Sequence, residues 1–105
     1  MKFAAFGMNE NSRRIEITNR YLRAYARYVG QDKKRRRCVE ETLATLIANP
    51  YELRLKTHPL KGSQAGVLSC SCGYDCRIIF QLRNEAKTKT EIIILIDVGT
   101  HDEVY

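Results

Sequence analysis

Apolar residues recur at helical spacing in two segments near the start of the chain. In the first segment, Thr18 or Asn19 can cap a helix that ends at Gly30. In the second, Asp32 can cap a helix that ends at Asn49-Pro50, because the residue before a proline is disfavoured in helical conformation. The positions that we expect to face the core are Tyr21, Leu22, Tyr25 and Val29 in the first helix, and Val39, Leu43, Leu46 and Ile47 in the second.

Strand patterns precede and follow these helices. A polar loop at residues 83–90 makes the last two strands a hairpin, residues 51–66 form a connector, and residues 1–12 form a loose lead-in. This order predicts one α+β domain over residues 1–105, in which the two N-terminal helices pack on one face of a small antiparallel sheet. The expected strands are residues 14–18, 67–72, 76–82 and 91–98.

The charge of the chain indicates an anionic partner, and its hydropathy argues against a membrane segment. The 105 residues include 18 Lys and Arg against 12 Asp and Glu, which gives a formal net charge of +6. Such a chain is expected to meet a polyanion or an acidic protein. The longest apolar run, residues 92–96, is far shorter than the ~18 residues that span a bilayer, and the N-terminus becomes polar too soon for a signal peptide. We therefore expect a cytoplasmic protein with no membrane partner.

The four cysteines could form two disulfides or a metal site. Their spacing is irregular, whereas structural zinc sites usually show regular cysteine or histidine pairs. Cys70 and Cys72 also fall on the same face of an expected strand. We therefore favour reduced, half-buried thiols, and we expect neither a metal nor another cofactor. The cysteines are Cys38, Cys70, Cys72 and Cys76.

The only two histidines lie in two polar clusters. His58 lies in the segment Thr57–Gly62, and His101 lies in the segment Gly99–Tyr105, directly after the most apolar strand. If the strands between the clusters pair side by side, both clusters reach one end of one sheet and form a small polar site.

Four motifs occur in order along the strand region. They are His58-Pro59-Leu60-x-Gly62, Gly66, Gly73-Tyr74-Asp75-x-Arg77-Ile78-Ile79-Phe80 and Gly99-Thr100-His101-x-x-x-Tyr105. Together they resemble the motifs of the RelE/YafQ toxins of type II toxin–antitoxin modules, which have a RelE-like microbial RNase fold. The resemblance covers residues 14–105 and favours the YafQ branch.

This resemblance implies a ribosome-dependent mRNA endonuclease that needs no metal. The 2′-hydroxyl would attack its own 3′-phosphate, which requires a base, an acid and cations around the phosphorus. Histidines suit the proton transfers near neutral pH, and a terminal aromatic ring can stack on an unpaired base. The residues that the resemblance puts in the active site are His58, Asp75, Arg77, His101 and Tyr105, with Lys61 as a further RNA-binding cation.

Two positions depart from the YafQ pattern. Ser71 stands where the pattern has a second histidine, and Cys76 stands where it has a tryptophan. Serine cannot replace histidine in proton transfer at neutral pH. Arg77, in contrast, matches the arginine with which RelE stabilises phosphate. The pattern predicts a hybrid site, in which His58 and His101 transfer protons and Arg77 supplies charge; a weak nuclease is the alternative.

Five cations open the second predicted helix, where the helix macrodipole disfavours positive charge. A solvated face is the commonest explanation of a charge run, but the conflict with the macrodipole favours a contact with phosphates of ribosomal RNA. These cations are Lys33, Lys34, Arg35, Arg36 and Arg37.

Two other function classes stay open. A ParE-like toxin of the same fold inhibits DNA gyrase by binding and needs no catalytic histidines. A non-enzymatic subunit of this fold could serve with its antitoxin as a DNA-binding repressor. The partners that the resemblance implies are a cognate acidic antitoxin, the ribosome with its mRNA, and operator DNA bound through the antitoxin.

Overall fold

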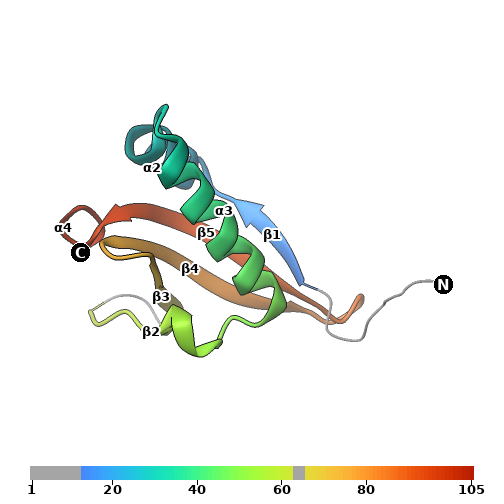
Figure 1. Ribbon diagram of the computed structural model, residues 1–105. Coiled ribbons are helices and arrows are strands. Elements are labelled where there is room, and N and C mark those ends of the chain that lie inside the picture. The colour runs from blue at the N-terminus through green and yellow to red at the C-terminus, as the bar shows by residue number, and fades with distance from the viewer. Residues whose placement is uncertain (1–12, 63–65) are drawn as a thin grey trace.

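The computed structural model describes residues 13–62 and 66–105, so the expected lead-in at residues 1–12 lies outside the described residues. Two long helices lie on one side of a sheet, and a short helix follows the last strand (Figure 1). No helix in the described part of the chain is long and apolar enough to cross a membrane. The elements in chain order are β1 (Arg13–Ile17), α2 (Asn19–Val29), α3 (Lys33–Ala48), the 3-10 turn η1 (Leu53–Leu55), β2 (His58–Pro59), β3 (Val67–Cys72), β4 (Cys76–Glu85), β5 (Thr90–Thr100) and α4 (His101–Val104).

The five strands form one mixed sheet in the order β1-β5-β4-β3-β2. The expected antiparallel meander of β3, β4 and β5 is confirmed, but the sheet is not wholly antiparallel, because β1 pairs parallel to β5. Periodicity within a strand carries no information about its partner, so the sequence does not predict this pairing. The hairpin is also longer than expected: its strands continue to Glu85 and from Thr90, and only residues 86–89 turn.

The expected helix boundaries are confirmed. The hydroxyl of Thr18 accepts a hydrogen bond from a backbone N–H in the first turn of α2 (3.1 Å). The carboxylate of Asp32 accepts two from the first turn of α3 (2.9 and 3.0 Å). Gly30 ends α2 with a φ of +50°, and Asn49 is the C-cap of α3. The sequence therefore determines where both helices begin and end.

Two of the predicted core positions in these helices are wrong. Leu22 is 53% exposed and Ile47 is 41% exposed, whereas Ala24 and Thr42 are buried. Each helix contacts the sheet through a stripe rotated toward these smaller residues. Small side chains let a helix approach a sheet closely, but they contribute little to the apolar pattern of the sequence.

A β-bulge in β5 decides which residues near its end face the helices. Ile96 has no partner in β4, so the alternation of side chains shifts by one residue there. Leu95 and Val98 both join the core beneath the helices. Positions Asp97 and Gly99 consequently belong to the opposite face of the sheet, which we call the open face.

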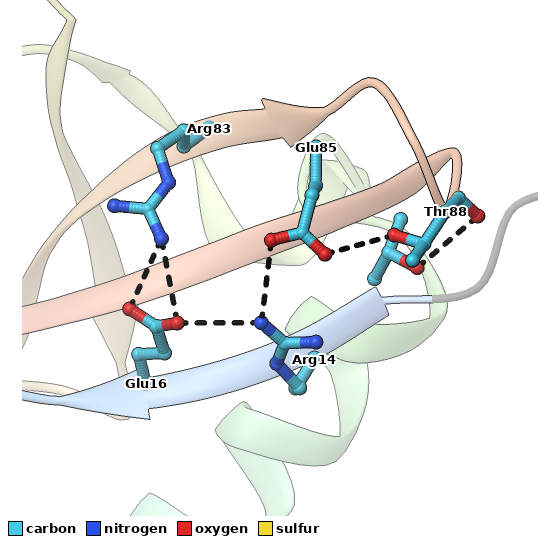
Figure 2. Close-up of polar contacts among 6 residues, drawn as sticks. Arg14, Glu16, Arg83, Glu85 and Thr88 are labelled. Atoms are coloured by element: carbon cyan, nitrogen blue, oxygen red, sulfur yellow. Dashed lines mark hydrogen bonds and ion pairs between the residues drawn. The ribbon is translucent and has the colours of Figure 1, made fainter.

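A charge network covers the hairpin end of the open face (Figure 2). Glu16 accepts hydrogen bonds from Arg83 (3.3 Å) and Arg14 (3.4 Å), and Arg14 also lies 3.9 Å from Glu85. These side chains come from β1 and β4 and lie over β5, where Ile92 is fully buried. Long charged side chains cover apolar surface with their methylene groups. The histidine clusters lie at the other end of this face.

Candidate functional site

A cleft of about 490 Å³ lies at the end of the open face near the C-terminus. His58 stands opposite Ser69 in the ladder between β2 and β3, so both residues belong to the open face. The structure therefore brings the two histidine clusters of the sequence to one cleft. Its lining residues are His58, Pro59, Leu60 and Lys61 on one side, and Val104 and Tyr105 on the other.

Tyr105 links this cleft to the second histidine. Its ring lies edge-on to the ring of His101, with 4.5 Å between the ring centroids and an angle of 87° between the planes. Its hydroxyl forms a hydrogen bond with the hydroxyl of Ser69. Tyr105 keeps 48% of its surface exposed, and Ser69 is fully buried. The exposed part of Tyr105 is thus open to a ligand in the cleft.

His58 is held in one orientation by a backbone contact. Its Nδ1 lies 2.8 Å from the carbonyl oxygen of Lys56. A carbonyl oxygen only accepts hydrogen bonds, so Nδ1 is the donor, and a neutral His58 ring then carries its lone pair on Nε2. Lys56 itself has a φ of +52°, which is uncommon for a residue with a side chain. A neutral His58 can therefore accept a proton at Nε2.

The helix α4, which carries His101, is fixed by a capping box. The hydroxyl of Thr100 accepts from the backbone N–H of Glu103 (3.3 Å), and the Glu103 carboxylate accepts from the backbone N–H of Thr100 (2.8 Å). Glu103 also lies 3.9 Å from the guanidinium of Arg27 in α2. The exposed ring of His101 has its Nδ1 3.5 Å from the carboxylate of Asp102. The backbone under His101 is therefore fixed while its ring faces solvent.

Arg77 also belongs to the open face, one row of paired residues beyond the row that contains Ser69. It pairs with Ser71 on one side and Gly99 on the other. This row is two residues, roughly 7 Å, along the strands from the row that contains Ser69. The Nη1 group of Arg77 donates to the carbonyl of Cys76 (2.9 Å). An arginine has five N–H donors, so Nε and Nη2 can still bind an anion.

Asp75 and the basic run lie beside the β3–β4 turn rather than in the cleft. Asp75 is an exposed residue of this turn, which covers residues 73–75. The basic run 33–37 leads directly into Cys38, whose Sγ lies 3.6 Å from Sγ of Cys72 at the start of the turn. The run is therefore at the same end of the sheet as α4, which lies near the C-terminus in Figure 1.

Arg35 differs from its neighbours in the basic run because it is engaged with α2. Its guanidinium lies 4.3 Å from the centroid of the Tyr28 ring, and it donates to the Tyr28 carbonyl (2.7 Å). This cation holds the two helices together. All five residues of the run are exposed.

Cys70, Cys72 and Cys76 lie in the core, and Cys38 of α3 packs against it, away from the cleft. All four are free thiols, and three are fully buried rather than half-buried; only Cys38 is partly exposed. Burial raises the pKa of Cys38 to about 11 and the pKa of Cys70 to about 12, so both thiols stay protonated near neutral pH. Within residues 13–62 and 66–105, no three His, Cys, Asp or Glu side chains are arranged to hold a metal ion.

The profile of a family described as the bacterial toxin of type II toxin–antitoxin systems, YafQ, matches residues 13–105. The chain belongs to the YafQ toxin family. No curated protein sequence matches it. Three similar solved structures share the α+β fold of this YafQ-family chain. They are the E. coli DinJ–YafQ complex (22% identity, 89% of this chain and 98% of that chain, TM-score 0.67), YafQ from E. coli strain BL21(DE3) (21%, 89% and 98%, 0.64) and a YoeB/ParE toxin from Agrobacterium tumefaciens (17%, 84% and 98%, 0.69).

Two residues of the open face in this YafQ-family chain have a role that the sequence alone does not reveal. Ser69 reads as an ordinary strand residue, and only the register of β2 and β3 reveals that it lies beside His58. Asp97 looks like an interruption of the apolar strand, yet its buried carboxylate lies 3.0 Å from the guanidinium of Arg20 in α2. This ion pair joins α2 to β5. A polar residue inside an otherwise apolar strand is the signal that could have identified Asp97.

Proposed function

We propose that this YafQ-family chain is the toxin of a type II toxin–antitoxin module and cuts ribosome-bound mRNA without a metal. The observation that carries the proposal is the meeting of both histidine clusters at one cleft. His58 and Tyr105 line the cleft, and the ring of Tyr105 contacts His101. These are the only two histidines of the chain, and two proton-transfer groups are what this reaction requires.

In the proposed reaction, His58 is the base and His101 is the acid. Nε2 of His58 takes the proton of the 2′-hydroxyl, because Nδ1 already donates to the Lys56 carbonyl. The 2′-oxygen then bonds to the phosphorus, and the bond from phosphorus to the 5′-oxygen breaks. His101 gives its proton to the leaving 5′-oxygen. The products carry a 2′,3′-cyclic phosphate and a 5′-hydroxyl.

Cations of the open face balance the charge on the phosphate. Arg77 belongs to this face, its Nε and Nη2 have no hydrogen bond to the described residues, and Lys61 lines the cleft. In such a reaction negative charge accumulates on the non-bridging oxygens, which donors of this kind stabilise. Tyr105 stacks on an unpaired base through its exposed surface. Asp75, at the exposed turn, accepts hydrogen bonds from RNA outside the cleft.

The ribosome completes the reaction in this proposal. Ser71 stands where the family pattern has a second histidine, so this chain has only His58 and His101 for proton transfer and depends on the ribosome to orient the substrate. The ribosome supplies the geometry of the substrate. The basic run binds ribosomal RNA through its exposed cations, and Arg23 of α2 is a further exposed cation on the adjoining helix. The cations of the run that bind RNA are Lys33, Lys34, Arg36 and Arg37, since Arg35 holds α2.

We further propose that a cognate antitoxin silences this chain in the cytoplasm. The solved DinJ–YafQ complex supports such a partner. Because the chain carries a net charge of +6, the antitoxin segment that folds onto it is acidic. The pair of proteins binds operator DNA through the antitoxin.

The test incubates the purified chain with programmed ribosomes, with free mRNA, and with DNA gyrase in separate reactions. We expect rapid cleavage on the ribosome, slow cleavage of free RNA and no inhibition of gyrase supercoiling. The cut ends should be labelled by a 5′-kinase without prior phosphatase treatment. Rapid cleavage of free RNA, 5′-phosphate ends or gyrase inhibition would contradict the proposal.

A further inference from the structure

Ser69 is a fully buried hydroxyl on the open face. A buried hydroxyl without a partner costs free energy, so its partner matters to the structure. The partner of its side chain is the hydroxyl of Tyr105, thirty-six residues later in the chain. The hydrogen bond joins the middle of β3 to the last residue of the sequence.

Among the described residues, Tyr105 has two further contacts with His101, one through its backbone N–H and one through its ring. It follows α4, a helix of four residues, and its backbone N–H donates to the carbonyl of His101 (3.1 Å). The hydrogen bond to Ser69 ties the far end of the Tyr105 side chain to the sheet, and the ring then lies edge-on to His101 at 4.5 Å.

We infer that Ser69 is a positioning residue, which sets the orientation of the Tyr105 ring and, through it, that of the His101 ring. The hydroxyl of Tyr105 is essential to this arrangement, because a phenylalanine could keep the ring contact but not the hydrogen bond. The consequence for catalysis rests on the proposed function, while the structural link does not. Misplacing a catalytic group by about 1 Å can reduce a rate 100-fold.

The structural link is tested by NMR of the imidazole C–H groups, which give two sets of signals because the chain has two histidines. A His58→Gln variant assigns the set that remains to His101. The Tyr105 ring should shift the His101 signals away from their random-coil positions. In Ser69→Ala and in Tyr105→Phe this displacement should decrease to a similar extent, and the double variant should show no further decrease. Ser71→Ala, on the same face of the same strand, is the matched control and should leave the signals unchanged.

The consequence for activity is tested with the same variants on ribosome-bound mRNA. We expect Ser69→Ala and Tyr105→Phe each to reduce the cleavage rate about 10-fold to 100-fold. Unchanged His101 signals in Ser69→Ala would overturn the inference whether or not the chain is a nuclease. If Ser69→Ala changes the His101 signals but cuts mRNA at the full rate, Ser69 has no role in catalysis. If Ser69→Ala changes the His101 signals but the wild-type chain cuts no mRNA, the proposed function is contradicted and the structural link stays intact.

Discussion

Gly99 and Glu103 are in such close contact that a side chain at residue 99 would displace the Glu103 carboxylate. A Cβ added to Gly99 would lie 2.7 Å from a carboxylate oxygen of Glu103 and 3.2 Å from its Cβ. The same carboxylate accepts a hydrogen bond from the backbone of Thr100. The glycine before Thr100 therefore allows the capping box that fixes α4 and its histidine.

We predict that Gly99→Ala weakens the site more than the fold. The new methyl group displaces the Glu103 carboxylate, which is the mobile end of a side chain, so the free energy of unfolding should fall by only about 1 kcal/mol, the usual cost of a lost cap. Cleavage of ribosome-bound mRNA should fall at least 10-fold, because α4 is no longer fixed. Urea unfolding and a cleavage assay measure the two effects. A stable Gly99→Ala variant with full activity would show that the capping box does not position His101.

Ser71 of β3 is paired with Arg77 of β4, and both residues belong to the open face. A Ser71→His substitution puts a proton-transfer group beside the guanidinium. We expect cleavage to rise about 10-fold or more, since a positioned acid or base typically contributes at least this much. Ser71→Ala should have the rate of the wild type. An unchanged rate in a folded Ser71→His variant would mean that this row of the sheet lies outside the site.

Much of the fold, but less of the site, follows from the sequence. Thr18, Gly30 and Asp32 act locally, so their patterns determine the helix ends in advance. The parallel pairing of β1 with β5 and the hydrogen bond between Ser69 and Tyr105 join residues that are far apart in the chain. No local pattern encodes such contacts.

Local patterns also do not determine which helix residues are buried or how close the two histidine clusters lie. Leu22 and Ile47 fit the helical period, but the contact between each helix and the sheet decides which side of the stripe is buried. The motifs identify His58 and His101 as candidates. The two histidine clusters meet at one cleft because β2 pairs with β3 and because the Tyr105 hydroxyl is hydrogen-bonded to Ser69.

A third prediction concerns stability at alkaline pH. Burial raises the pKa of Cys70 to about 12, above its value of about 8.5 in an unfolded chain. A raised folded-state pKa means that the stabilising contribution is complete below about pH 8.5 and is lost as the pH rises toward 12. In that window the free energy of unfolding should fall by about 1.4 kcal/mol per pH unit from this thiol.

Urea unfolding at about pH 8, 9 and 10 measures this decrease in the free energy of unfolding. Cys70→Ala should be less stable at pH 8, because it leaves a small cavity. Its stability should decline less steeply with pH than that of the wild type. Equal pH slopes in the two proteins would show that Cys70 does not titrate on unfolding.

A fourth prediction concerns the antitoxin. Since the chain carries a charge of +6, its affinity for an acidic antitoxin should fall as salt rises from about 50 mM to about 500 mM, where the Debye length shortens from about 14 Å to about 4 Å. Calorimetric titration of the purified pair gives the dissociation constant at each salt concentration. A constant affinity over this range would remove the electrostatic part of the proposed complex.

In the proposed reaction, the two histidines transfer protons in one cleavage step. The most direct measurement is the rate at which His101→Ala, His58→Ala and the double variant cut ribosome-bound mRNA, with Lys87→Ala at the distant hairpin turn as the control. We predict a loss of about 10²–10⁴-fold for each single variant, a double variant that loses less than the product of the two, and unchanged folding and antitoxin binding. A folded His101→Ala variant that cuts mRNA at the wild-type rate would contradict a role of His101 in proton transfer.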